Sequence, residues 1–260
     1  MTSHGTGSPV ITSTRNALVL DAVRLHRSRE RRRQGLTIVE GPHVFAAAVR
    51  CGVKPTMVFS LEDDEVTAEM CATNGLTFRP VAADVLQRLA PTQTPRGPVA
   101  VIPVPQAREV RPTDTTVLLG VSDPGNSGTL VRSASGFGFD IAAGHESADP
   151  WSPKVLRAGA GAQFDVHVAA VGSDPVGELR QAGLFVVASV PAAGPAISEL
   201  PSAPIALLVG SEASGLPPHV VEACDAKTSI PTALIESLNA AVAGSILMYE
   251  RARTRVPRRP

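Results

Sequence analysis

Aromatic residues and cysteines are both scarce in this sequence. Aromatic side chains make up 3% of the 260 residues, which argues against a binding surface built from exposed stacked rings. The three cysteines, Cys51, Cys71 and Cys224, lie far apart and match neither a disulfide framework nor paired zinc-ligand spacings. The cysteine usage therefore predicts a reducing, cytoplasmic setting and no metal site.

The sequence also lacks an excess of charge of either sign and long apolar runs. The 24 basic and 24 acidic residues balance, so the chain as a whole lacks the electrostatic mark of a nucleic-acid binder. No apolar run approaches the roughly 20 residues of a membrane span, and the N-terminus lacks the zones of a secretory signal. Residues 1–12, which are rich in glycine and serine at their start, read as a flexible leader. These absences predict a globular protein with no membrane partner.

The first half alternates between helical and strand-like patterns. A basic helical pattern over Asn16–Arg33 stops at Gly35 and is followed by the apolar run Leu36–Val39. Similar pairs of helix and strand continue to a last strand at Val99–Val104. The alternation predicts a small α/β domain over residues 13–105, followed by a proline-containing linker over residues 106–115.

The basic helix concentrates positive charge that the rest of the chain lacks. It and its flank hold Arg15 and six further arginines against only Asp21 and Glu30; the six are Arg24, Arg27, Arg29, Arg31, Arg32 and Arg33. A solvated charged face is the usual explanation of such a run. Seven arginines so close together nevertheless favour contact with nucleic-acid phosphates, and we take the six as RNA-binding candidates.

Residues 116–260 contain longer apolar runs that alternate with helical patterns. The runs predict strands at Val117–Val121, Phe139–Ala143, Val166–Val171, Leu184–Val190 and Ile205–Val209. Near-continuous apolar strands of this kind are typical of a parallel sheet that is covered on both faces. A final helix is predicted from Glu236 to about Arg253, with Leu238, Val242, Ile246 and Met248 facing inward.

Three segments of this second half place glycine or polar residues after an apolar strand, at the edge where open α/β sheets bind ligands. The first holds Asn126 and Arg132, the second Gly210 and Glu212, and the third Ile230, Ser237, Leu238 and Asn239. Each segment alone is explained as well by helix capping or by an ordinary turn. The glycine spacing of the second segment matches neither a dinucleotide fingerprint nor a phosphate-binding loop, which disfavours a nucleotide-dependent oxidoreductase.

In their order and spacing, the three segments resemble the three motifs of the SpoU (TrmH-like) branch of the SPOUT methyltransferases, and the resemblance extends from about Asn16 to the end of the chain. It implies an RNA 2'-O-ribose methyltransferase that uses S-adenosylmethionine without a metal. It also implies a catalytic domain over residues 116–260 with a deep trefoil knot and a mostly parallel sheet, homodimerisation through that domain, and a preceding RNA-binding domain of a ribosomal-protein-like α/β fold. Ribosomal RNA is favoured over transfer RNA as substrate.

The resemblance also implies roles for the motif residues. Gly210, Ile230 and Leu238 correspond to cofactor contacts, while Asn126, Arg132, Glu212, Ser237 and Asn239 correspond to catalytic positions. Because arginine stays protonated, we expect Arg132 to clamp an RNA phosphate and stabilise the developing alkoxide, with the other four residues orienting it and the ribose or bracing the loop. Compared with the third motif of that family, the loop between Pro231 and Glu236 is one residue short. A non-catalytic RNA-binding protein with the same fold is therefore the alternative.

Overall fold

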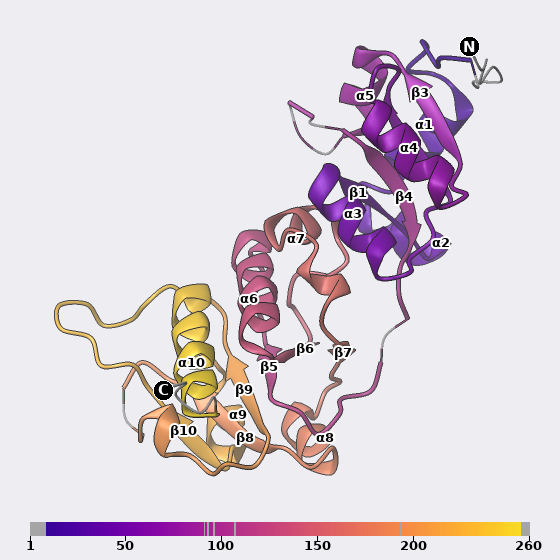
Figure 1. Cartoon of the computed structure of the whole chain (residues 1–260). Coiled ribbons are helices and arrows are strands. Elements are labelled where there is room, and N and C mark those ends of the chain that lie inside the picture. The colour runs from indigo at the N-terminus through magenta and orange to yellow at the C-terminus, as the bar shows by residue number, and fades with distance from the viewer. Residues whose placement is uncertain are drawn as a thin grey trace. The chain divides into compact units, whose positions relative to one another are not determined.

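The computed structural model describes residues 9–90, 92, 94, 95, 97–106, 108–192 and 194–255 (Figure 1). Most of the predicted leader lies outside these residues. The chain divides into two compact units, which we call unit 1 (Met1–Pro105 with Trp151–Gly161) and unit 2 (Gln106–Pro150 with Ala162–Pro260). The division at Pro105 coincides with the predicted domain boundary. The assignment of Trp151–Gly161 to unit 1 was not predicted.

Unit 1 is built on a four-stranded sheet in the order β1-β4-β2-β3. Its strands are β1 (Leu36–Glu40), β2 (Met57–Leu61), β3 (Phe78–Val81) and β4 (Val99–Pro103). Its helices are α1 (Ala17–Arg24), α2 (Ser28–Gln34), α3 (Pro42–Arg50), α4 (Glu65–Thr73), α5 (Ala83–Leu89) and α7 (Pro153–Ala158). β4 runs antiparallel to both β1 and β2, whereas β2 and β3 are parallel. The predicted alternation of helices and strands is thus present, with α7 as an addition from a distant part of the sequence.

The basic region forms two helices rather than the single predicted one. Asn16 caps α1 by accepting a hydrogen bond from the Leu18 backbone N–H, and Gly35 ends α2 in a left-handed conformation. Arg31 differs from the other arginines because it is buried, with 6% of its surface exposed, and donates to the carbonyl oxygens of Leu25 and His26. Its guanidinium satisfies the carbonyl groups at the end of α1, so Arg31 is a structural residue and we no longer count it among the RNA-binding candidates.

Unit 2 is an α/β unit on a six-stranded sheet in the order β10-β8-β9-β5-β6-β7, and every neighbouring pair of strands is parallel. Its strands are β5 (Thr115–Leu118), β6 (Asp140–Ala143), β7 (Val168–Ala170), β8 (Phe185–Ser189), β9 (Ile205–Val209) and β10 (Ala226–Thr228). Its helices are α6 (Pro124–Phe137), η1 (Ala162–Phe164), α8 (Pro175–Gln181), η2 (Ile197–Glu199), α9 (Pro218–Ala223) and α10 (Ala240–Arg255). α9 and β10 were not predicted, because both are short. The knot stays a prediction.

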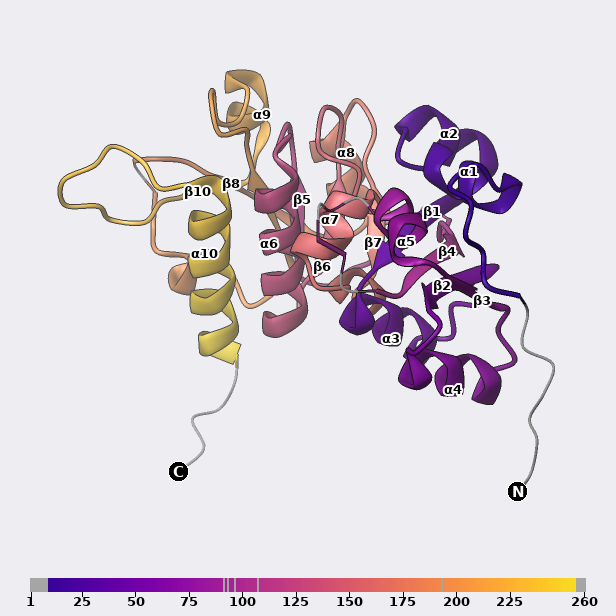
Figure 2. The same cartoon turned by 90° about the horizontal axis from the view of Figure 1, so that it is seen from above.

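Helices cover both faces of this sheet, as the apolar runs predicted. On one face Val117, Val186 and Leu208 share a buried core with Leu179 of α8 and Val220 of α9. On the other face α6 and α10 lie side by side, and Gly244 of α10 packs closely against Leu130 and Val209 (Figure 2). None of the described helices is long and apolar enough to cross a membrane.

The segment predicted as a linker is largely attached to unit 2. The Arg111 guanidinium binds both carboxylate oxygens of Asp140, at 2.6 and 2.9 Å, and the Thr113 hydroxyl also donates to Asp140. Burial raises the pKa of Asp140, but these hydrogen bonds outweigh it and leave the pKa below its ordinary value. The His167 ring also bonds the Glu109 carbonyl at 2.7 Å. The residues after Ala107 are therefore held against the sheet rather than free to act as a linker.

Candidate functional site

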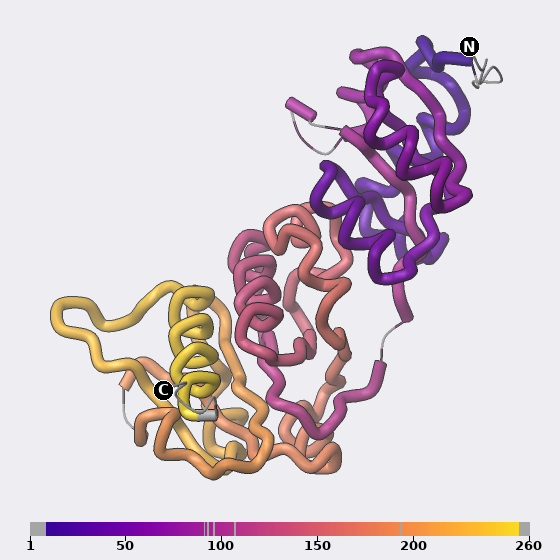
Figure 3. Tube along the Cα trace, viewed as in Figure 1, coloured from indigo at the N-terminus to yellow at the C-terminus, as the bar shows by residue number. Residues whose placement is uncertain are grey.

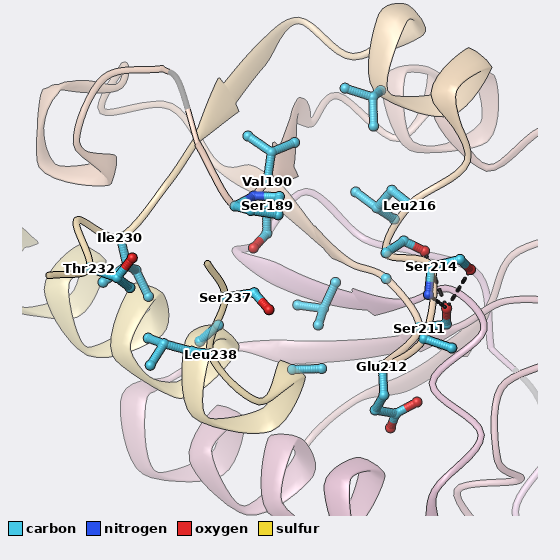
Figure 4. Close-up of a pocket in the computed structure, with 18 residues that line it drawn as sticks. Ser189, Val190, Ser211, Glu212, Ser214, Leu216, Ile230, Thr232, Ser237 and Leu238 are labelled. Carbon is cyan, nitrogen blue, oxygen red and sulfur yellow. Dashed lines mark hydrogen bonds between the residues drawn. The ribbon is translucent and has the colours of Figure 1, made fainter. Parts of the chain in front are cut away.

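A cavity of about 380 Å3 opens at the carboxyl edge of the sheet in unit 2 (Figure 4). It is formed where the chain leaves β8, β9 and β10, the edge at which parallel sheets bind ligands. Its lining residues are Ser189, Val190, Pro191, Val209, Gly210, Ser211, Glu212, Ala213, Ser214, Gly215, Leu216, Val221, Ile230, Thr232, Ser237, Leu238, Ala240 and Ala243. Five predicted site residues, Gly210, Glu212, Ile230, Ser237 and Leu238, thus line one cavity, and Glu212 is the one acidic or basic side chain among the lining residues.

The loop after β9 folds tightly back on itself. The backbone N–H groups of Ser211 and Gly215 each donate to the carbonyl of the other residue, at 3.1 and 3.0 Å. Gly210 lies so close to this loop that a Cβ atom there would come within 2.2 Å of the Gly215 carbonyl carbon. A glycine is therefore required at position 210 because any side chain there would prevent the loop from closing.

A chain of side-chain hydrogen bonds joins the three predicted segments. Asn239 Nδ2 donates to Asn126 Oδ1 at 3.1 Å, and Asn126 Nδ2 donates to Glu212 Oε1 at 2.7 Å. We call these three residues the Asn–Asn–Glu chain. The segments lie up to 113 positions apart in the sequence, so this contact is a product of the fold.

The direction of the Asn–Asn–Glu chain is set by helix α10. Asn239 Oδ1 accepts from the backbone N–H groups of Ala241 and Val242, at 2.9 and 3.2 Å, and so caps the helix. With its oxygen committed to the helix, the Asn239 amide can only present N–H to Asn126. Asn126 must then accept from Asn239 and donate to Glu212, which supplies the Glu212 carboxylate with a fixed donor.

The start of the last helix differs from the prediction. α10 begins at Ala240, not at Glu236, and residues 229–239 form a long loop that projects from unit 2 (Figure 3). Ser237 and Leu238 therefore lie in this loop, where both face the cavity together with Ile230 and Thr232 (Figure 4). Val242 and Ile246, expected to face inward, are 46% and 36% exposed because the buried face of α10 is formed by Ala241, Leu247 and Met248.

Arg132 lies apart from the cavity-lining residues. It is exposed in the middle of α6, six positions after Asn126, which a helix rotates well away from the Asn126 face. Its guanidinium makes no hydrogen bond or ion pair with any described residue, and Asn126 bonds Glu212 and Asn239 instead of orienting it. The first turn of α6 is capped by Asp123, which accepts from the Asn126 N–H, so Asn126 is not the cap that its residue type suggested.

Sequence reasoning missed one wall of the cavity. Ser189, the last residue of β8, and Val190 and Pro191 after it line the cavity, yet no motif marks them. The available signal was the strand order: β8 lies between β9 and β10, so its carboxyl end must open beside the second and third segments. Among the described residues, no group of His, Cys, Asp and Glu side chains is arranged to hold a metal ion.

The fold and the cavity define an α/β enzyme with its ligand site at the carboxyl edge of a parallel sheet. The model of the SpoU rRNA methylase family matches residues 115–249, and that of an MRM3-like substrate-binding domain matches residues 16–100. The chain therefore belongs to the SpoU rRNA methylase family, as the motifs predicted, and is an RNA methyltransferase.

Characterised and solved proteins are similar over almost the whole chain. The 23S rRNA (guanosine(2553)-2'-O)-methyltransferase RlmP of Bacillus subtilis is 30% identical, over 92% of this chain and 97% of its own length. An AdoMet-bound rRNA methyltransferase from Sinorhizobium meliloti is 28% identical with a TM-score of 0.85, over 96% of this chain and 99% of that one. The SpoU methyltransferase AviRb of Streptomyces viridochromogenes, solved with AdoMet, is 27% identical with a TM-score of 0.83, over 93% of this chain and 98% of that one.

Proposed function

We propose that this RNA methyltransferase transfers a methyl group from S-adenosylmethionine to a ribose 2'-hydroxyl of ribosomal RNA. The observation that carries the proposal is the Asn–Asn–Glu chain beside the cavity, since it ties the three family motifs into one site. The relative from Bacillus subtilis, by its name, acts on the 2'-oxygen of a 23S rRNA guanosine. This supports ribosomal RNA over transfer RNA and disfavours a non-catalytic RNA-binding protein.

The cavity suits S-adenosylmethionine in size and chemistry. Its volume of about 380 Å3 falls within the roughly 300–1,000 Å3 of small-molecule sites. Apolar side chains such as Ile230, Leu216 and Leu238 offer a surface for an adenine ring. When bound, the cofactor supplies a methyl group that its sulfonium makes electrophilic.

The residues of the Asn–Asn–Glu chain would hold the ribose, and the 2'-hydroxyl proton released by the transfer would pass to the RNA phosphate that Arg132 is proposed to hold. Glu212 stays fixed by the Asn126 amide, so its second carboxylate oxygen is free to accept a hydrogen bond from a ribose hydroxyl. The Ser237 hydroxyl, which also faces the cavity, is suited to the same task. Such fixed contacts align the 2'-oxygen with the methyl group, and alignment is the main requirement of this transfer.

We propose that Arg132, although it lies outside the cavity lining, clamps an RNA phosphate and stabilises the developing alkoxide of the bound ribose. Its exposed guanidinium has no partner among the described residues, so it is available to an anionic ligand. A planar fork with several donors suits two phosphate oxygens at once. The proposed role of Arg132 thus rests on its exposed guanidinium, which has no partner among the described residues, and on its place in the first motif.

We propose unit 1 as the domain that binds the RNA substrate, through α2. Arg27, Arg29 and Arg32 are exposed and make no hydrogen bond or ion pair in the part of the chain that the structure describes, while Arg33 and Arg24 are exposed but pair with Glu30 and Asp21. The buried guanidinium of Arg31 fixes α2 and leaves its other arginines outside. Free, exposed arginines on a fixed helix are suited to phosphate contact.

We also propose that two copies associate through α10. Val242, Ile246 and Tyr249 recur at helical spacing and are 46%, 36% and 50% exposed. Leu234 and Ile235, in the loop before α10, are exposed as well. A contiguous apolar face of this kind is typical of a protein interface, and its place beside the loop of the third motif fits the predicted dimer of the catalytic domain.

The proposed function is tested with the purified chain, labelled S-adenosylmethionine and ribosomal RNA that lacks the modification. Calorimetry should detect cofactor binding, and mapping of 2'-O-methyl sites should find one new position after incubation. Methylation of transfer RNA alone would overturn the substrate class. RNA binding with no cofactor binding at millimolar concentration would establish the non-catalytic alternative.

A further inference from the structure

The segment Trp151–Gly161, which contains α7, belongs to unit 1 although the sequence on both sides of it belongs to unit 2. It lies inside the range matched by the methylase family model and outside that matched by the substrate-binding domain model. The chain leaves unit 2 after Pro150 and re-enters it at Ala162. Unit 1 is therefore completed by a segment from the range that the methylase family model matches.

The segment is held firmly in place at both ends. At its start, the buried Thr37 hydroxyl of β1 donates to the Trp151 carbonyl at 2.8 Å. At its end, Gly161 lies so close to α3 that a Cβ atom there would come within 3.2 Å of both Ala47 and Val44. Ala160, just before Gly161, adopts a left-handed conformation, with φ of 51°, in the turn that ends the segment.

The exit and re-entry points within unit 2 are joined as well. The Gln163 side chain, which is buried, donates from Nε2 to the Pro150 carbonyl at 3.1 Å. This hydrogen bond closes the base of the excursion across thirteen positions of sequence. The excursion is thus a fixed element of the fold, because its two ends and its base are all bonded or packed.

α7 presents two unpaired cations on its outer face. Val155 and Leu156 are buried and pack the helix onto unit 1, whereas Lys154 and Arg157 are exposed. Lys154 and Arg157 stand three positions apart, so they share one side of the helix. Neither makes a hydrogen bond or an ion pair with any residue that the structure describes, and residues 151–161 contain no acid that would offset them.

We propose that α7 is a second RNA-contact element of unit 1, at which Lys154 and Arg157 bind backbone phosphates of the substrate. The inference rests on the proposed function and extends its RNA-binding surface beyond α2. Both helices pack against the same strand, β1, and Thr37 at the start of that strand is bonded to the segment three positions before Lys154. Unit 1 thus carries exposed cations on two helices that contact the same strand, and two phosphate contacts need no base readout.

The test replaces both cations by alanine in the full chain, as Lys154→Ala with Arg157→Ala, and titrates a ribosomal RNA fragment at several salt concentrations. The slope of log Kd against log salt should fall by about 1.4, which is roughly 0.7 for each lost contact to single-stranded RNA and somewhat more for duplex. At ~0.1 M salt the affinity should fall by roughly tenfold or more. Cofactor binding and the unfolding midpoint should be unchanged, since both side chains point away from the core.

A matched control is Lys54→Ala with Arg88→Ala, which removes the same charge from two other exposed and unpaired positions of unit 1. Equal losses of RNA affinity in the two double variants would overturn the proposal, because the effect would then come from the overall positive charge of unit 1 and not from contacts at α7. An unchanged salt slope in the α7 variant would overturn it too. If the unmodified chain methylates ribosomal RNA, either result refutes the role of α7 alone; if it neither binds nor methylates RNA, the proposed function itself has failed.

Discussion

Replacing Asn239 by aspartate separates the two tasks of that residue. Asparagine caps α10 with its oxygen and donates to Asn126 with its nitrogen. Aspartate retains the capping oxygen but has no N–H to donate. The Asn126 amide is then drawn to donate to the new carboxylate, and its oxygen turns toward Glu212. The variant should therefore keep the helix and lose the fixed donor that holds Glu212.

The size of the effect follows from the bonds involved. A hydrogen bond to a charged group contributes about 1.5–3 kcal/mol, and the lower figure applies because Glu212 is exposed. About 1.4 kcal/mol corresponds to a tenfold change in rate, so methyl transfer should slow by roughly tenfold. The cap is kept, so the unfolding midpoint should stay within about 1 °C, whereas Asn239→Ala should lose about 1 kcal/mol of stability and roughly 2–4 °C.

The assay is single-turnover methyl transfer at saturating cofactor and RNA, paired with thermal unfolding. A double variant that combines Asn239→Asp with Asn126→Ala should be little slower than Asn126→Ala alone, because the chain is already broken at Asn126. Turnover at the unmodified rate in Asn239→Asp would refute the role of the Asn–Asn–Glu chain. So would a loss that adds fully to that of Asn126→Ala, since the two residues would then act independently.

The remaining predictions concern separate parts of the catalytic unit. Arg132→Ala should keep the fold and cofactor binding, while methyl transfer falls by about 100-fold or more, the loss typical of a removed oxyanion donor. Arg132→Lys should restore little activity, because lysine lacks the planar fork of the guanidinium. Near-normal turnover of Arg132→Ala would exclude the phosphate clamp. Gly210→Ala should weaken cofactor binding in calorimetry, because the new methyl group collides with the backbone at Gly215 and opens the loop. Ile246→Glu should yield monomers in sedimentation equilibrium, and an unchanged molecular mass would remove α10 from the proposed interface.

The sheet of unit 2 was predictable because burial on both faces leaves a simple pattern. The run Ile205–Val209 was predicted with the bounds that β9 has in the structure. The linker was mispredicted because prolines and mixed charge say nothing of tertiary partners: Arg111 is bonded to Asp140, 29 positions away. The break between α1 and α2 was equally hidden, since the Arg31 side chain that satisfies the end of α1 looks like any other surface arginine.

The site was predictable in its membership but not in its connections. The motifs named Gly210, Ile230 and Leu238, and all three line the cavity. The bond from Asn126 to Glu212 could not be predicted, because 86 positions separate them and only the parallel order of β5 and β9 brings their carboxyl ends together. Ser189 and Pro191 were not predicted for the same reason: their residue types indicate no function, and only the position of β8 in the sheet brings them to the cavity.

The start of α10 determines whether the site can exist. Had the helix begun at Glu236, Ser237 and Leu238 would have been wound into its first turn, where the unpaired backbone N–H groups compete for the Ser237 hydroxyl. Because the helix begins at Ala240 instead, both residues stay in the loop and line the cavity. The same start makes Asn239 the cap, which turns its amide nitrogen toward Asn126 and orders the donors as far as Glu212. A single helix boundary therefore shapes the cavity and orients the polar groups beside it.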